Sequence, residues 1–292
     1  MKLSLAIVIA SLCVGVVVPT AIKSALPADD DQVLLQADRA LFGNGVYSGT
    51  LNDKLLAADF TWTDGAGSTR NKSQIMQDFK SGKKHWTEAG SSNGDDLPAP
   101  TTARAHTYGR VGIVQESSRN IYVLRVWVRN AEGWRLLIYQ AVSVGAPPST
   151  EPGKANCENP CNTVPFQPRT EDEREVIHAY QEVERAVTAH NSAAWAAHIA
   201  DEFFAVTSNS DRPLDKATRM AGLDSQKVAG IAPFPLVSAR MFEFGNAMVM
   251  TSLQQPEHGL PLHVTRVWFK RNGVWFEAYS YQTTIQAAGS TR

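Results

Sequence analysis

Hydrophobic and polar positions follow the same order twice along the chain, once on each side of a proline-rich stretch. Each half opens with apolar residues that recur every three or four positions, which is typical of a helix with one buried face. These residues are Val33, Leu34, Ala37 and Leu41 in the first half, and Val176, Tyr180, Val183 and Val187 in the second. A capping box, Thr170-x-x-Glu173, favours a helix start in the second half. Each half is therefore predicted to begin with an amphipathic helix.

Both halves then carry signals for two more helices and for short strands. Second helices are predicted at Leu51–Ala58 and Ser192–Ala200. Third helices are predicted at about Lys72–Ser81 and from Pro213 onward, because proline suits a first helical turn. The short strands that follow are Arg104–Tyr108, Val111–Glu116, Val237–Phe244 and Ala247–Gln254.

The last two strands of each half give the closest match between the halves. Arg125-Val126-Trp127 and Trp134 have the same spacing as Arg266-Val267-Trp268 and Trp275. The turns between them are Asn130–Gly133 and Asn272-Gly273, and Asn-Gly between alternating strands is a strong hairpin signal. Each half is therefore predicted to be an α+β domain with three helices packed on a four-stranded antiparallel sheet.

The two halves are separated by the stretch Gly145–Thr170, which holds six of the fifteen prolines. Proline fixes φ and removes a backbone donor, so this stretch is predicted to be a linker. The resulting boundaries are a first domain at residues 29–145, a linker at 146–170 and a second domain at 171–292.

The composition is that of a globular protein, with 43% hydrophobic and 20% charged residues, which excludes a disordered or fibrous chain. The formal net charge is -1, from 28 Lys and Arg against 29 Asp and Glu. This balance lacks the positive excess that nucleic acids require of a partner.

The N-terminus carries a pattern that predicts export. Lys2 is followed by an apolar run, Leu3–Val18, which is shorter than the roughly 20 residues of a membrane span and fits a signal-peptide core. Residues 1–28 are therefore predicted to be a signal peptide, and the protein to be periplasmic or extracellular. An uncleaved N-terminal anchor is the alternative. Export allows disulfides to persist, so Cys157 and Cys161 are predicted to form one, with free thiols as the alternative.

The order of elements, the motif ADFTWTDG at Ala58–Gly65 and the two RVW hairpins resemble the nuclear transport factor 2-like superfamily. Within it the chain resembles tandem, secreted members of the ketosteroid-isomerase/SnoaL-like group. The resemblance implies two cone-shaped domains, each with a curved sheet. It does not imply one activity, because this fold hosts isomerases, cyclases, dehydratases and binding proteins.

Hairpin geometry divides the strand residues between two faces. If Asn272-Gly273 is a two-residue turn, residues whose numbers sum to 545 lie opposite each other and side chains alternate. By resemblance to the isomerases, one face lines the cone. With Tyr180 from the first helix, the residues predicted to line a ligand pocket are Tyr122, Leu124, Tyr139, Thr265, Phe276, Ser280 and Gln282.

The opposite face is too apolar to be left in water in the first half. We therefore expect the two domains to pack sheet to sheet as an internal pseudo-dimer. The tryptophans predicted at this interface are Trp127, Trp134, Trp268 and Trp275, with homodimerisation or packing within each domain as alternatives. Glu277, Tyr279 and Tyr281 are predicted on the same face, as a ladder with Arg266 and Lys270.

Two residues are candidates for catalysis. Asp64 falls on the position of the isomerase base, where the second half has Thr207, but Asp before Gly is also a common turn former. His263 is predicted at the open end of the second cone, where it is either a general base or a polar rim residue. The positions of the isomerase oxyanion acid fall on Leu124 and Thr265, so the catalytic set is incomplete.

The sequence contains no motif for a metal, a phosphate or a nucleophilic serine, and no cofactor is expected. The prediction is an exported tandem protein that binds a small, largely apolar molecule and has no stable membrane span after processing. The alternative is a cofactor-free isomerase, cyclase or dehydratase with Asp64 or His263 as its base.

Overall fold

A computed structural model describes residues 29–42, 52–82, 103–118, 120–145, 157–225 and 233–286. The predicted signal peptide at residues 1–28 lies outside this part, as do residues 146–156 of the predicted linker. Within the described ranges, no helix is both long enough and apolar enough to cross a membrane.

The first lobe is a six-stranded sheet with helices on one side. Its helices are α1 (Asp30–Phe42), the 3-10 turn η1 (Asp53–Leu55) and α2 (Lys72–Lys80). Its strands are β1 (Leu56–Thr63), β2 (Thr69–Asn71), β3 (Arg104–Tyr108), β4 (Val111–Ser118), β5 (Ile121–Asn130) and β6 (Gly133–Ser143). They lie in the order β2-β1-β6-β5-β4-β3.

The second lobe repeats this plan. Its helices are α3 (Glu171–Thr188), α4 (Ser192–Ala196) and α5 (Lys216–Ser225). Its strands are β7 (Ile199–Thr207), β8 (Leu214–Asp215), β9 (Leu236–Glu243), β10 (Ala247–Gln254), β11 (Leu262–Arg271) and β12 (Val274–Thr284). The order β8-β7-β12-β11-β10-β9 matches that of the first lobe strand for strand. The protein is thus a tandem α+β protein with two cone-shaped lobes.

The predicted four-stranded meander is present in each lobe, but each sheet has two more strands. β1 pairs with β6 in parallel, and β7 pairs with β12 in the same way. The second helices are shorter than predicted, because the chain is already extended from Leu56 and from Ile199. The third helix of the second lobe begins at Lys216, after the short strand β8, rather than at Pro213.

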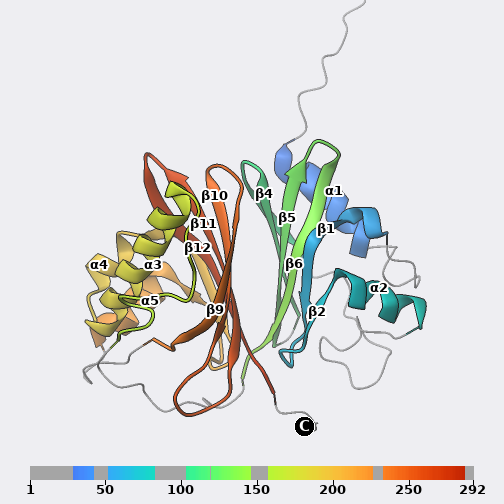
Figure 1. Ribbon diagram of the computed structural model, residues 1–292. Coiled ribbons are helices and arrows are strands. Elements are labelled where there is room, and N and C mark those ends of the chain that lie inside the picture. The colour runs from blue at the N-terminus through green and yellow to red at the C-terminus, as the bar shows by residue number, and fades with distance from the viewer. Residues whose placement is uncertain are drawn as a thin grey trace, which may run out of the picture.

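The two sheets face each other at the centre of the molecule and the helices cover their outer faces (Figure 1). Val126, Leu124 and Leu137 of the first lobe share one buried cluster with Val267 and Tyr279 of the second. Gln140, which is 1% exposed, donates from Nε2 to the backbone oxygens of His263 and Tyr281 and to Oγ1 of Thr283. The expected sheet-to-sheet packing is therefore present.

The tryptophans do not form this interface, contrary to the sequence prediction. Trp127 and Trp134 pack with residues of α1 on the outer side of the first sheet. Trp268 and Trp275 pack with residues of α3 on the outer side of the second sheet. Both faces of each sheet are buried, one by helices and one by the other sheet, so hydrophobicity alone could not tell them apart.

The last strand of each lobe contains a one-residue bulge, which changes the sheet face on which the following side chains lie. Pairing runs from Trp127 with Leu136 to Val126 with Ile138, which leaves Leu137 without a partner. The second lobe has the same shift at Ala278. Side chains beyond a bulge point to the opposite face from the one that strict alternation would give.

The described end of the linker is attached to the second lobe. Cys157 and Cys161 form a disulfide. The Asn159 side chain donates to the backbone oxygen of Leu236 and accepts from its N–H, at 2.9 and 3.0 Å. Thr170 caps α3 by accepting from the N–H of Glu173. The Glu173 carboxylate accepts from the Arg169 N–H instead of closing the predicted capping box.

Candidate functional site

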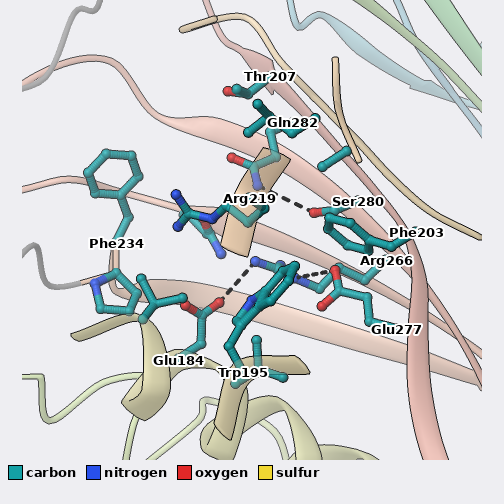
Figure 2. A pocket seen from close by; sticks show the side chains of 16 residues that line it. Glu184, Trp195, Phe203, Thr207, Arg219, Phe234, Arg266, Glu277, Ser280 and Gln282 are labelled. Atoms are coloured by element: carbon teal, nitrogen blue, oxygen red, sulfur yellow. Dashed lines mark hydrogen bonds and ion pairs between the residues drawn. The ribbon is translucent and has the colours of Figure 1, made fainter. Parts of the chain in front are cut away.

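The second lobe contains a cavity of about 260 Å³ between its helices and its sheet (Figure 2). Its walls are mainly apolar and its floor is charged. Its lining includes Val183, Glu184, Trp195, Phe203, Ala205, Arg219, Phe234, Gln254, Arg266, Glu277, Ser280 and Gln282. They come from α3, α4, α5, strands β7 and β10 to β12, and the segment before β9.

Small side chains at the centre of the sheet leave room for this cavity. Ala205 on β7 lies beside Ser280 on β12. The matching pair in the first lobe is Trp62 on β1 and Tyr139 on β6, whose rings stack with their centroids 3.3 Å apart. An alanine and a serine thus occupy the positions at which the first lobe has two large rings.

A buried group of charges forms the floor of the cavity. Arg266 Nη2 lies 3.1 Å from Glu184 Oε1, and Arg266 Nε lies 3.3 Å from Glu277 Oε1. The side chains of Glu184, Arg266 and Glu277 are 10%, 6% and 4% exposed. The Arg266 guanidinium also lies over the ring of Tyr180, 4.7 Å from its centroid. These contacts fix the arginine between two carboxylates from different elements.

Burial shifts the titration of these groups. Burial raises the pKa of Glu277 to about 7, although Arg266 beside it acts in the opposite direction. Burial also raises the pKa of Glu184, again against the effect of Arg266. The pKa of the Tyr180 phenol, which hydrogen-bonds Glu184, is raised mainly by burial. Few carboxyl groups in proteins titrate near neutral pH, and those that do are often found in functional sites.

The first lobe has a matching arginine that is fully paired. Arg125 donates from Nε and Nη2 to the two carboxylate oxygens of Asp38, at 2.8 and 2.9 Å, and from Nη1 to Glu116 at 2.6 Å. Trp127 Nε1 donates to Asp38 as well, at 3.0 Å. All three donor nitrogens of Arg125 are therefore occupied within the protein.

The pocket residues predicted from the sequence are divided among four places. Ser280 and Gln282 line the cavity. Tyr180 lies beneath it, where its hydroxyl accepts from Gln254 at 3.5 Å. Tyr139 faces the helices of the first lobe and stacks on Trp62.

The other four predicted pocket residues lie on the faces between the sheets. Leu124 belongs to the inter-sheet cluster, and Tyr122 and Phe276 pack against it. Thr265 has the same orientation as Val267, which is also in that cluster. The prediction placed them in the cones because it assigned the two sides of the hairpins in reverse.

The two candidate bases lie away from the cavity. Asp64 Oδ1 accepts from the N–H groups of Ala66 and Ser68 at 3.0 and 2.9 Å, which is the hydrogen bonding of a turn former. Its Oδ2 lies 3.7 Å from Arg70 Nη1. His263 is on the inter-sheet side of β11, and burial lowers its pKa while the carboxylate of Asp64 acts to raise it. Neither side chain lines the cavity.

Sequence reasoning missed the charged floor. Glu277 and Arg266 were predicted in a ladder on the inter-sheet face, and the structure places both under the helices. Glu184 had a usable signal, because it lies four residues after Tyr180 and therefore on the apolar side of α3. A carboxylate on a buried helix face is uncommon unless it has a partner.

Within the described residues, no group of three or more His, Cys, Asp or Glu could hold a metal ion.

No protein-family model matches the chain, and no curated protein matches it. Solved structures similar to it include an NTF2-like protein from Cytophaga hutchinsonii ATCC 33406, with 15% identity over 40% of this chain and 100% of that chain and a TM-score of 0.35. An NTF2-like protein of unknown function from Pseudomonas putida KT2440 has 14% identity over 41% of this chain and 92% of that chain, with a TM-score of 0.35. The association domain of C. elegans CaMKII has 10% identity over 39% of this chain and 95% of that chain, with a TM-score of 0.33. The similarity concerns the fold and does not extend to a ligand or a reaction.

Proposed function

We propose that the protein is an exported binding protein that takes a small, largely apolar molecule into the cone of its second lobe. The observation that carries this proposal is the cavity beside Ala205 and Ser280, where the first lobe has stacked rings. Its volume, about 260 Å³, is slightly below the usual range for ligand sites and suits a compact molecule of two or three rings. Trp195, Phe203 and Phe234 supply an apolar wall.

Binding of N-phenyl-1-naphthylamine, a neutral probe made of a naphthyl and a phenyl group that fluoresces in apolar surroundings, tests this proposal. The wild-type protein should bind the probe, and Ala205→Trp should abolish binding because it introduces the ring that the first lobe has at the matching position. Ala193→Trp places the same ring on an exposed position of α4 and should leave binding unchanged. Absence of binding to the wild type, or equal binding to Ala205→Trp, would contradict the proposal.

Export is supported by the apolar run Leu3–Val18. Mass spectrometry of the protein recovered from the periplasm or medium of its native cells should show that about 28 residues are missing from the N-terminus. Recovery of the intact chain from the cytoplasm alone would contradict export.

Proton transfer is a second candidate function, and the pKa of Glu277 favours it. A carboxylate that titrates at about 7 in an apolar cavity is suited to act as a general base at neutral pH. This version replaces Asp64 and His263 by Glu277. In the test reaction, base-promoted ring opening of 5-nitrobenzisoxazole, the carboxylate takes the C–H proton while the N–O bond breaks. The wild-type rate should follow a pKa of about 7, and Glu277→Gln should abolish this rate. Asp64→Asn is the control, and equal rates for Glu277→Gln and Asp64→Asn would exclude Glu277 as the base.

A further inference from the structure

Arg266, which lines the cavity, has a buried guanidinium nitrogen with no partner among the described residues. Arg266 uses Nη2 for Glu184 and Nε for Glu277, but Nη1 has no hydrogen-bond acceptor among the described residues. The whole side chain is only 6% exposed. In the first lobe Asp38 and Glu116 occupy every donor nitrogen of Arg125. A buried donor without an acceptor is costly, so an acceptor supplied from outside would be favourable there.

A second arginine reaches the same cavity from another element. Arg219 on α5 lines the cavity, and no hydrogen bond or ion pair joins it to any described residue. Burial lowers its pKa, with partial compensation from the charge of Glu184. Figure 2 shows the Arg219 side chain in the cavity, with Gln282 and the Glu184–Arg266 pair also labelled. Two arginines from different elements thus line one cavity.

The charge balance of the cavity favours an anion. Two arginines, Arg219 and Arg266, stand against two carboxyls, Glu184 and Glu277. Burial raises the pKa of Glu277 to about 7, so this carboxyl is only partly ionised at neutral pH. When Glu277 is protonated, two guanidinium groups face one carboxylate, so the cavity then has a net positive charge and the charge of Arg266 is only partly compensated.

We infer that the second cone recognises its ligand through a carboxylate, which Arg266 Nη1 and the Arg219 guanidinium hold from two sides. The ligand class is a small organic acid whose hydrocarbon part packs against Trp195, Phe203 and Phe234. A carboxylate fits because its two oxygens can accept from separate guanidinium donors. This inference rests on the proposed function, since it assigns the polar group of the molecule that the cone would bind.

The test compares 1-naphthoate with 1-naphthamide, which has the same rings and no charge. Both are titrated calorimetrically, and both are used to displace N-phenyl-1-naphthylamine. Naphthoate should bind at least about tenfold more tightly than naphthamide, because hydrogen bonds to charged groups are worth more than neutral ones. Arg219→Gln should lower the affinity for naphthoate by about tenfold more than it lowers the affinity for naphthamide or for the neutral probe.

Arg219 is the residue of choice for substitution because it has no partner among the described residues, so its removal leaves no carboxylate unpaired. Arg212→Gln is the matched control, since Arg212 is an exposed arginine of the same lobe outside the cavity. Equal binding of acid and amide to the wild type would overturn carboxylate recognition while the binding function stood. An equal loss of both in Arg219→Gln would also overturn it. Failure of the neutral probe and of both naphthyl compounds to bind would remove the binding function itself.

Discussion

Trp62 lies flat on Tyr139 in the first lobe, with 3.3 Å between ring centroids and 5° between ring planes. The two side chains are 1% and 6% exposed. Truncation of a buried tryptophan removes its burial energy and leaves a cavity in the core. Trp62→Ala should therefore lower the free energy of unfolding by about 3–5 kcal/mol, measured by urea unfolding followed by circular dichroism.

Val237→Ala is the control for this substitution. Val237 is 54% exposed on β9, and its truncation should change stability by less than about 0.5 kcal/mol. A cost of Trp62→Ala no larger than that of Val237→Ala would show that the stacked pair is not part of the core.

Gln140 connects the two sheets through three hydrogen bonds. Its Nε2 lies 2.9 Å from Thr283 Oγ1, which itself donates to the backbone oxygen of Ala141 at 2.8 Å. Gln140→Ala should cost about 1–3 kcal/mol, because it removes a buried donor that three acceptors of the second lobe share. In a double-mutant cycle, Gln140→Ala and Thr283→Val should show a coupling energy of about 0.5–3 kcal/mol. Strict additivity of the two costs would contradict the connection.

The sequence predicts the hairpins correctly as far as the first four pairs from the turn. Asn272 and Gly273 both have positive φ, 52° and 79°, which is what Asn-Gly favours in a two-residue turn. Pairing then follows the predicted sum of 545 from Arg271 with Val274 to Trp268 with Glu277. These features depend on residues close together in the chain, and short-range patterns are enough to fix them.

The bulges at Leu137 and Ala278 could not be predicted in the same way. Neither residue is a glycine or a turn former, and the bulge shows only in the pairing with the neighbouring strand. Ser280 and Gln282 were assigned to the cone because two errors cancelled. The faces were assigned in reverse near the turn, and the bulge then reversed them again. Glu277 precedes the bulge, so its predicted position on the inter-sheet face is wrong.

The free energy of unfolding should fall more when one partner of the buried pair Asp38–Arg125 is removed than when both partners are replaced. Their side chains are both 4% exposed and are joined by two hydrogen bonds. Asp38→Ala leaves the Arg125 charge with Glu116 alone and should cost about 3–5 kcal/mol in unfolding experiments. Asp38→Leu combined with Arg125→Met should cost less than Asp38→Ala. The reverse order would contradict this account.

The stability of the second lobe should depend on the protonation of Glu277. Burial raises the pKa of Glu277 from an ordinary 4.5 to about 7. Well below pH 4.5 the carboxyl is neutral in both the folded and the unfolded chain, so its ionisation does not lower the free energy of unfolding there. As pH rises from about 4.5 to about 7, the unfolded chain loses its proton first, so the free energy of unfolding falls.

The matched comparison is Glu277→Gln, which cannot ionise. The wild type should lose up to about 3 kcal/mol relative to this variant over that pH interval, and nothing further above about pH 7. Urea unfolding of both proteins at a series of pH values measures the difference. A constant difference across the interval would mean that the carboxyl titrates normally in the folded protein.

Binding of a carboxylate in the second cone should be linked to the same proton. The titratable groups around Glu277 are Arg266 from β11, Glu184 and Tyr180 from α3, and Arg219 from α5. An anionic ligand beside Arg266 disfavours a negative charge on Glu277, so the complex should take up a proton. The affinity for 1-naphthoate should therefore increase as pH falls through about 7, by at most about tenfold per pH unit.

Calorimetric titrations between about pH 6 and about pH 8.5 measure this linkage, because the naphthoate carboxyl, with a pKa near 4, stays ionised throughout. Glu277→Gln keeps the side-chain shape and should bind naphthoate with little dependence on pH. Naphthamide, which has no charge, should show the same flat profile with the wild type. An affinity for naphthoate that increased with pH in the wild type would place the carboxylate away from Glu277. Titrations in buffers of different ionisation enthalpy give the number of protons taken up, and we expect it to be between zero and one at neutral pH and to vanish in Glu277→Gln.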